Sequence, residues 1–124
     1  MRALPLLLAA AVLAACDSPG GAPPQTGGEY RVVLVSPHGA EGAAAIDLVG
    51  TGIESVAAEE GTLFEEPVGA ARRVVVVREP AGAIRFRIVM APGHPLPTGA
   101  VVEVVDPDDR PRASLAGYRV TLSR

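Results

Sequence analysis

Three carboxylates stand together in the segment Asp106-Pro107-Asp108-Asp109, and such a cluster could hold a cation. Calcium takes several oxygen ligands from a compact loop. This segment lacks the glycine and the distal glutamate of an EF-hand, and Pro107 restricts its backbone. Aspartate is also frequent in turns, because its side chain accepts hydrogen bonds from nearby backbone amides. The sequence therefore predicts an Asp-rich turn and no metal site, with Asp106, Asp108 and Asp109 as the candidate calcium ligands.

The two histidines, His38 and His94, each lie in a turn rich in proline and glycine. If both turns met at one end of the fold, the two imidazoles could share a metal ion with Glu41. Their spacing matches no zinc-binding motif. We therefore expect both histidines to be solvated turn residues.

Nucleophilic catalysis needs a serine or cysteine beside a positioned histidine and a carboxylate. Ser55 lacks the glycine pattern of a nucleophile elbow. Ser36 is two positions from His38, and neighbouring turn residues rarely form a triad. The sequence therefore predicts a protein that is not an enzyme and that uses no cofactor.

All eleven cationic side chains are arginines, a bias that a GC-rich genome would produce. Five of them lie close together in the sequence: Arg72, Arg73, Arg78, Arg85 and Arg87. Arg72 and Arg78 share one strand parity, so only part of the set can share a face. Two interpretations remain open, a basic binding stripe and cross-strand ion pairs with Glu79 or Glu103.

The N-terminus has the parts of a secretory signal, with Arg2 ahead of an apolar run over residues 3–15. That run is shorter than the roughly 20 apolar residues that span a bilayer. It ends in Leu13-Ala14-Ala15-Cys16, which resembles the lipobox of bacterial lipoproteins. The resemblance implies cleavage before Cys16 and acylation of Cys16 with diacylglycerol and a further chain such as palmitate. Two or more buried acyl chains anchor a protein stably to a membrane. The alternative is an ordinary cleaved signal that leaves a soluble secreted protein.

Three segments follow from this interpretation, beginning with a signal peptide over residues 1–15. Cys16 and the Pro/Gly-rich stretch to residue 28 would form a disordered tether, and residues 29–124 would form one domain. Loss of Arg2 with the signal makes the formal charge more negative than −3, which disfavours nucleic acid as a partner. Cys16 is the single cysteine, so the domain must be held together by packing alone.

The elements that position these side chains are short Val/Ile-rich runs separated by turn residues, a pattern typical of all-β domains. We expect strands over residues 30–36, 43–49, 53–58, 62–65, 72–78, 84–90, 101–105 and 118–122. Residues 40–48 could also form a short helix, but the glycines at 42, 50 and 52 weaken that alternative. The predicted fold is a single small antiparallel β-sandwich of about seven or eight strands.

Strand alternation also predicts which side chains face the core. Residues 84–90 alternate most cleanly, because Arg85 and Arg87 point to one side and four apolar side chains point to the other, toward the core: Ile84, Phe86, Ile88 and Met90. Four consecutive valines at 74–77 indicate burial on both faces or a central strand. The expected inward set is Val32, Leu34, Ile46, Leu48, Val56, Val74, Val76, Ile84, Phe86, Ile88, Val102, Val104, Tyr118, Val120 and Leu122.

Two fragments resemble known bacterial surface domains. Val35-Ser36-Pro37, the glycine-containing segment 39–45 and Ile84-Arg85-Phe86 loosely resemble cohesin-like and carbohydrate-binding-module-like sandwiches. Residues 115–120, Leu-Ala-Gly-Tyr-Arg-Val, resemble the tyrosine corner of immunoglobulin-like domains, with Tyr118 as its tyrosine. The resemblance implies a β-sandwich.

We expect a lipid-anchored protein of the bacterial cell envelope, facing the periplasm or the exterior, with a non-enzymatic domain that binds a protein partner. A first alternative is a glycan-binding or calcium-dependent ligand-binding module that uses the turns around His38, His94 and 106–109. A second is a structural or assembly factor of the envelope. Sandwich domains host many unrelated functions, so the fold alone does not separate these three.

Overall fold

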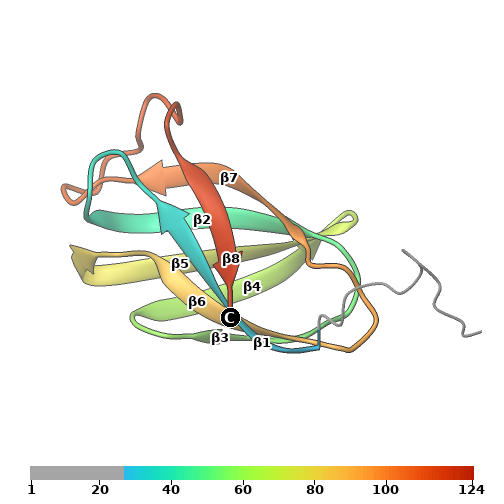
Figure 1. Cartoon of the computed structure of the whole chain (residues 1–124). Coiled ribbons are helices and arrows are strands. Elements are labelled where there is room, and N and C mark those ends of the chain that lie inside the picture. The colour runs from blue at the N-terminus through green and yellow to red at the C-terminus, as the bar shows by residue number, and fades with distance from the viewer. Residues whose placement is uncertain (1–26) are drawn as a thin grey trace, which may run out of the picture.

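The computed structural model describes residues 27–124, which form eight β-strands (Figure 1). These are β1 (Gly28–Val35), β2 (Glu41–Val49), β3 (Ile53–Ala58), β4 (Thr62–Val68), β5 (Ala71–Gly82), β6 (Arg85–Met90), β7 (Thr98–Val105) and β8 (Arg119–Ser123). Each of the eight strands overlaps a predicted one, although β4, β5 and β7 are longer than predicted, and residues 41–49 form a strand and not a helix. The predicted signal peptide, Cys16 and the tether as far as residue 26 lie outside the described residues. Within residues 27–124 no helix is long and apolar enough to cross a membrane.

The strands form two four-stranded antiparallel sheets. The first sheet has the order β3-β6-β1-β8 and the second has the order β4-β5-β2-β7. The two sheets pack against each other, and every connection except the β4–β5 hairpin passes from one sheet to the other (Figure 1). The predicted small antiparallel β-sandwich is therefore confirmed. The proline-rich segment 92–97 makes one of these crossings, between β6 and β7, as expected for residues that lack a ladder donor.

The core lies between the sheets and is built by strand alternation. In β6, Phe86 and Ile88 have no exposed surface, whereas Arg87 points outward. Ten of the fifteen side chains expected inside are buried: Val32, Leu34, Ile46, Leu48, Val74, Val76, Ile84, Phe86, Ile88 and Val104. A further four pack on the core while half-buried: Val56, Tyr118, Val120 and Leu122. Met90 is buried as well, on the side of β6 that the alternation of residues 84–90 predicted to face the core. Tyr30, Ala44 and the charged Glu41 are also buried, although they were not expected inside.

Val102 is the one residue of the inward set whose prediction was wrong. The pairing between β2 and β7 shifts by one position, from Ala45 opposite Glu103 to Ile46 opposite Val101. Val102 is the extra residue of this β-bulge, and 38% of its surface is exposed. A bulge reverses the parity of the strand beyond it, so Val101 packs on the core instead.

The sandwich has two distinct ends. At one of them the Gly27 carbonyl accepts a hydrogen bond from Nη2 of Arg124 at 3.1 Å, so the start of β1 lies beside the C-terminus (Figure 1). We call this the terminal end. The far end carries the β1–β2 turn, the β3–β4 turn, the β5–β6 connection and the long β7–β8 connection over residues 106–118. Residue 27, where the described part of the chain begins, therefore lies at the terminal end, opposite the far end.

Candidate functional site

Apolar side chains cover the part of the outer face of the second sheet that lies nearer the far end, next to a charged row of Glu66, Arg73 and Asp47. Strand register places Phe64, Val75 and Ala45 in one row, and Val77, Ala43 and Val105 in the next. Val49 and the bulged Val102 also point outward from this sheet. We define the apolar face as Ala43, Ala45, Phe64, Val75, Val77, Val102 and Val105, because the charged row of Glu66, Arg73 and Asp47 separates Val49 from the rest.

So many exposed apolar side chains are unusual on the outer side of an antiparallel sheet, which normally carries polar residues toward the solvent. Among residues 27–124, the exposed large hydrophobic side chains are Val49, Phe64, Val77, Val102 and Leu96. Phe64, Val77 and Val102 belong to the apolar face, and Phe64 is the most exposed at 59%. Val49 points outward from the same sheet, beyond the charged row. Single exposed apolar residues are common, whereas a contiguous patch marks an interaction surface.

The valine run in β5 explains why this surface forms. β5 lies between β4 and β2, so the predicted central position is confirmed. Burial on both faces was the other expectation, and it is wrong: Val74 and Val76 are buried, whereas Val77 on the opposite side is 37% exposed. The sequence thus carries an apolar second face that the domain itself does not cover.

A groove continues the apolar face toward the far end. It has a volume of about 740 Å³ and is lined by Gly42 and Ala43 of β2 and by Val77 and Arg78 of β5. Glu79 and Pro80 of β5 lie on one side, and Pro107 and Asp109 of the β7–β8 connection lie on the other. The face and the groove together form one candidate binding surface.

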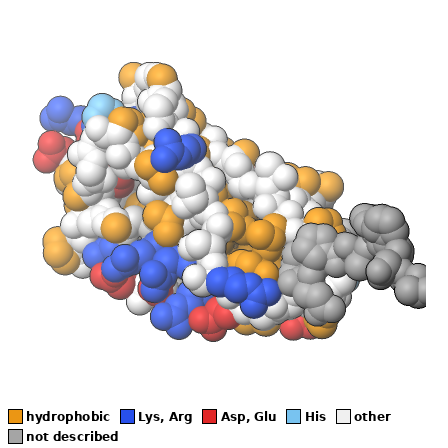
Figure 2. Space-filling view, viewed as in Figure 1, with side chains coloured by type: hydrophobic (Ala, Val, Ile, Leu, Met, Phe, Trp, Pro, Cys, Tyr) orange, Lys and Arg blue, Asp and Glu red, His pale blue; other side chains and the backbone are white. Residues whose placement is uncertain are grey.

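The outer face of the first sheet is charged. Arg31 donates two hydrogen bonds to Glu59, at 2.8 and 2.6 Å, and Arg87 lies 3.3 Å from Glu29. Figure 2 shows basic and acidic side chains gathered on the lower part of the face turned to the viewer. The pKa of Glu59 is lowered, chiefly by its hydrogen bonds from Arg31.

The ion pairs of the predicted arginine cluster differ from those expected. Glu60, in the β3–β4 turn, pairs with both Arg85 and Arg78. On the second sheet, Arg73 pairs with Asp47 and Arg72 with Glu65. The expected pairs with Glu79 and Glu103 do not form within residues 27–124, because β3 and its turn lie next to β6 and bring other carboxylates closer.

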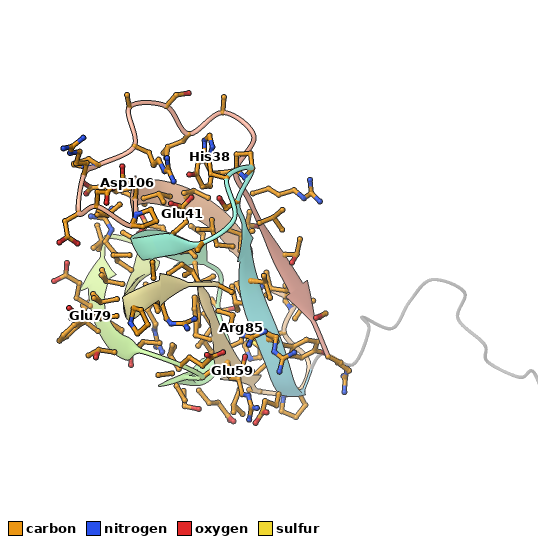
Figure 3. All side chains as sticks on the ribbon, turned by 90° about the vertical axis from the view of Figure 1, so that its left-hand side faces the viewer. His38, Glu41, Glu59, Glu79, Arg85 and Asp106 are labelled. Atoms are coloured by element: carbon orange, nitrogen blue, oxygen red, sulfur yellow. The ribbon has the colours of Figure 1, made fainter. Side chains whose placement is uncertain are left out.

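A buried carboxylate organises the far end (Figure 3). Glu41 begins β2 and is 1% exposed. Its oxygens accept hydrogen bonds from the Ser36 hydroxyl at 2.6 Å, from the Tyr118 hydroxyl, and from Nε and Nη2 of Arg112 at 3.1 and 2.9 Å. We call these four residues the Glu41 cluster. It joins the β1–β2 turn, β2 and the β7–β8 connection.

Two opposing effects set the pKa of Glu41. Burial raises it, but the hydrogen bonds from Ser36, Tyr118 and Arg112 and the charge of Arg112 together hold it below the ordinary value. The pKa of Tyr118 is raised by burial and by the neighbouring carboxylate. Glu41 is therefore an ionised group with all its oxygens engaged, a structural anchor rather than a general base.

The candidate calcium ligands form the expected turn. One Asp106 carboxylate oxygen accepts hydrogen bonds from the backbone amides of Asp108 and Arg110, at 2.8 and 3.0 Å. These bonds lower the pKa of Asp106. Asp109 adopts a left-handed conformation, with φ of 64°, and its amide donates to the Asp106 carbonyl. Within residues 27–124 no group of three or more His, Cys, Asp or Glu side chains is arranged to hold a metal ion.

The two histidines lie at opposite ends of the sandwich, so the shared metal site considered with Glu41 does not form. The antiparallel pairing of β1 with β6 separates the turn that follows one strand from the loop that follows the other. His38 stacks at a tilt on Tyr118 at the far end, with ring centroids 5.9 Å apart. His94 contacts Thr51 at the terminal end, with Nδ1 3.0 Å from Oγ1.

Within residues 27–124 neither candidate serine is in side-chain contact with a histidine ring, since the ring of His38 lies on Tyr118 and that of His94 contacts Thr51. The Ser36 hydroxyl donates to Glu41 and accepts the backbone amide of His38 at 3.0 Å. Ser55 lies on β3, next to the bulge in its pairing with β6. The tyrosine-corner expectation is also corrected, because the Tyr118 hydroxyl bonds to a side chain of β2 and not to upstream backbone.

Sequence reasoning missed the apolar face of the second sheet and the buried Glu41 cluster. The valine run at 74–77, together with the alanines of β2, was the available signal for the apolar face. Glu41 gave no local signal, since its partner Arg112 lies 71 positions away. Comparison with protein-family models, curated proteins and solved structures found no match to this chain.

Proposed function

We propose that this chain is a lipid-anchored protein of the bacterial envelope whose β-sandwich binds a protein partner through the apolar face. One observation carries the binding role: nearly all exposed large hydrophobic side chains of residues 27–124 lie on one sheet surface. The support for the anchor is the lipobox-like sequence that ends in Cys16. The domain acts as an adaptor and not as an enzyme.

The geometry of the ends fits an anchored adaptor. A chain tethered through Cys16 meets the domain at the terminal end, where Gly27 and Arg124 touch. The apolar face runs along the side of the sandwich, and its groove opens at the far end. A partner could therefore approach without passing between the domain and the membrane.

The binding surface is tested by photo-crosslinking in intact cells. A photoreactive phenylalanine analogue replaces Phe64 on the apolar face or, as the matched control, Thr121, which faces outward from the first sheet. We expect a discrete adduct from position 64 and none from position 121. Equal labelling from both positions, or none from position 64, would contradict binding through this face.

The anchor is tested separately by the substitution Cys16→Ser. Removal of the thiol removes the acylation site, so the protein should move from the membrane fraction to the soluble fraction. Asp17→Ser changes the next residue and leaves the thiol in place, so this control should stay in the membrane fraction. Unchanged partitioning of the Cys16 variant would refute the lipid anchor.

A further inference from the structure

The charges around the apolar face have one predominant sign. Glu79, Glu103 and Asp109 border the face or its groove, and none of them has an ion-pair partner within residues 27–124. Arg78 also lines the groove, but its guanidinium pairs with Glu60 and donates to the Ala83 carbonyl. Glu66, which interacts with Arg73, adds a fourth carboxylate in the row next to Phe64. Arg73 is the cation of this row, and Asp47 already holds it at 2.7 Å. The apolar centre therefore has an acidic rim.

A second copy of this chain fits this surface poorly. Two such faces packed together would bring acidic rims into contact, and like charges across an interface cost free energy. The arginine-bearing face of another copy is also unsuitable, since Arg31, Arg85 and Arg87 are already occupied by Glu29, Glu59 and Glu60. Charge complementarity instead requires a different protein that carries free cations.

The sheet edges favour binding through the face. β3 and β7 are edge strands that carry bulges, and β4 carries Pro67, which cannot donate to a ladder. β8 is only five residues long. Bulges, prolines and short edges all discourage the addition of a partner strand. An incoming protein would therefore pack on the apolar face instead of extending a sheet.

We propose that the apolar face binds a protein surface with an apolar centre and a rim of arginine or lysine side chains. This inference rests on the proposed function and names the chemistry of the partner. Phe64 and Val77 contact the apolar centre, while Glu79 and Asp109 at the groove and Glu103 at the β7 edge receive the cations.

The size of the surface sets the expected affinity. Four strands about 4.8 Å apart and about seven residues long give a face of roughly 450 Å², about half the area per partner of a standard interface. Binding in solution should therefore be weak and sensitive to salt. A membrane tether would compensate by raising the local concentration of both partners.

The test uses two synthetic peptides that share one apolar centre, flanked by arginines in one and by glutamates in the other. Each is titrated into the full-length Cys16→Ser chain, and amide chemical shifts are followed by NMR. We expect the arginine-flanked peptide to shift resonances of β4, β5, β2 and β7 and the glutamate-flanked peptide to bind at least about tenfold more weakly. Higher salt should weaken the binding of the arginine-flanked peptide only.

Variants separate this inference from the proposed function. The double variant Glu79→Gln with Asp109→Asn should bind the arginine-flanked peptide about three- to tenfold more weakly. Arg85→Gln, on the other sheet, should leave that affinity unchanged. Phe64→Ser should abolish binding of both peptides. Equal binding of both peptides, or no effect of the double variant, would overturn the cationic partner while leaving the apolar face in place. Self-association that Phe64→Ser abolishes would show that the occupant is a second copy.

Discussion

Arg112 donates from both Nε and Nη2 to a single Glu41 oxygen, at 3.1 and 2.9 Å, across 71 positions of sequence. The contact fastens the β7–β8 connection to the start of β2. The two partners differ in burial, since the Glu41 side chain is 1% exposed and that of Arg112 is 22% exposed. Removing Arg112 and removing the charge of Glu41 should therefore destabilise the domain by different amounts.

Arg112→Gln should destabilise the domain more than Glu41→Gln. Without Arg112 a buried carboxylate loses its charge partner, which costs about 3 kcal/mol. Without the Glu41 charge, Arg112 can turn toward water, and we expect a loss of about 1–2 kcal/mol. Urea unfolding followed by circular dichroism measures both values. Asp47→Asn, in the more exposed pair with Arg73, is the control and should cost less than about 1 kcal/mol. The reverse order of the two variants would contradict this account.

Acid should destabilise the domain through its paired carboxylates. The pKa of Glu41 in the folded state lies below the ordinary value of 4.5, so the unfolded chain binds its proton first as the pH falls. Its contribution is therefore complete above about pH 4.5 and is lost as the pH falls through the folded-state pKa. The pKa values of Asp47, Glu59, Glu60 and Asp106 are lowered as well and act in the same direction.

The measurement is the urea midpoint as a function of pH. The midpoint of the natural chain should fall steadily below about pH 5. Glu41→Gln removes the group whose pKa is depressed by three side-chain donors, so its profile should be flatter. A profile of the variant that runs parallel to that of the natural chain would show that Glu41 does not contribute to the acid response.

Gly42→Ala should be more damaging than Gly99→Ala. A Cβ at Gly42 would lie 2.7 Å from the backbone carbonyl oxygen of Asp106, which the turn holds in place. A Cβ at Gly99 would lie 2.6 Å from Cγ1 of Val120, a half-buried side chain that can rotate. We expect a loss of about 2–3 kcal/mol for the first and about 1 kcal/mol for the second. If both variants lost similar amounts of unfolding free energy, the Asp106 carbonyl could move aside, and the β7–β8 connection would not be held in place as described.

The strands were predictable because their side chains alternate, and alternation is a local property. Residues 84–90 are the clearest example, with Phe86 and Ile88 inside and Arg87 outside. The contacts of the far end were not predictable, because they depend on which strands become neighbours. Glu59 and Glu60 reach the arginines of β6 only because β3 pairs with β6. Glu41 is buried only because Ser36, Arg112 and Tyr118 converge on it.

The role of the apolar face was predictable only in part. The valines at 74–77 indicated that both sides of β5 would be apolar, which they are. The sequence did not show that one side would remain uncovered, because that depends on how many layers the fold has. A two-layer sandwich buries one side of each sheet, and the other side of β5 is left for a partner.

Val102 and Val104 provide a direct test of the bulge in β7. In a regular strand both would face the core, whereas the shift between Glu103 and Val101 turns Val102 outward and leaves Val104 with no exposed surface. Val102→Thr should therefore change the free energy of unfolding by less than about 0.5 kcal/mol. Val104→Thr places a hydroxyl in the core and should cost about 2 kcal/mol. Urea unfolding of the two variants decides the matter, since equal losses would mean that β7 pairs with β2 without a bulge. Because Val102 belongs to the apolar face, the threonine variant should also weaken partner binding while the fold stays intact, which separates a role in recognition from a role in packing.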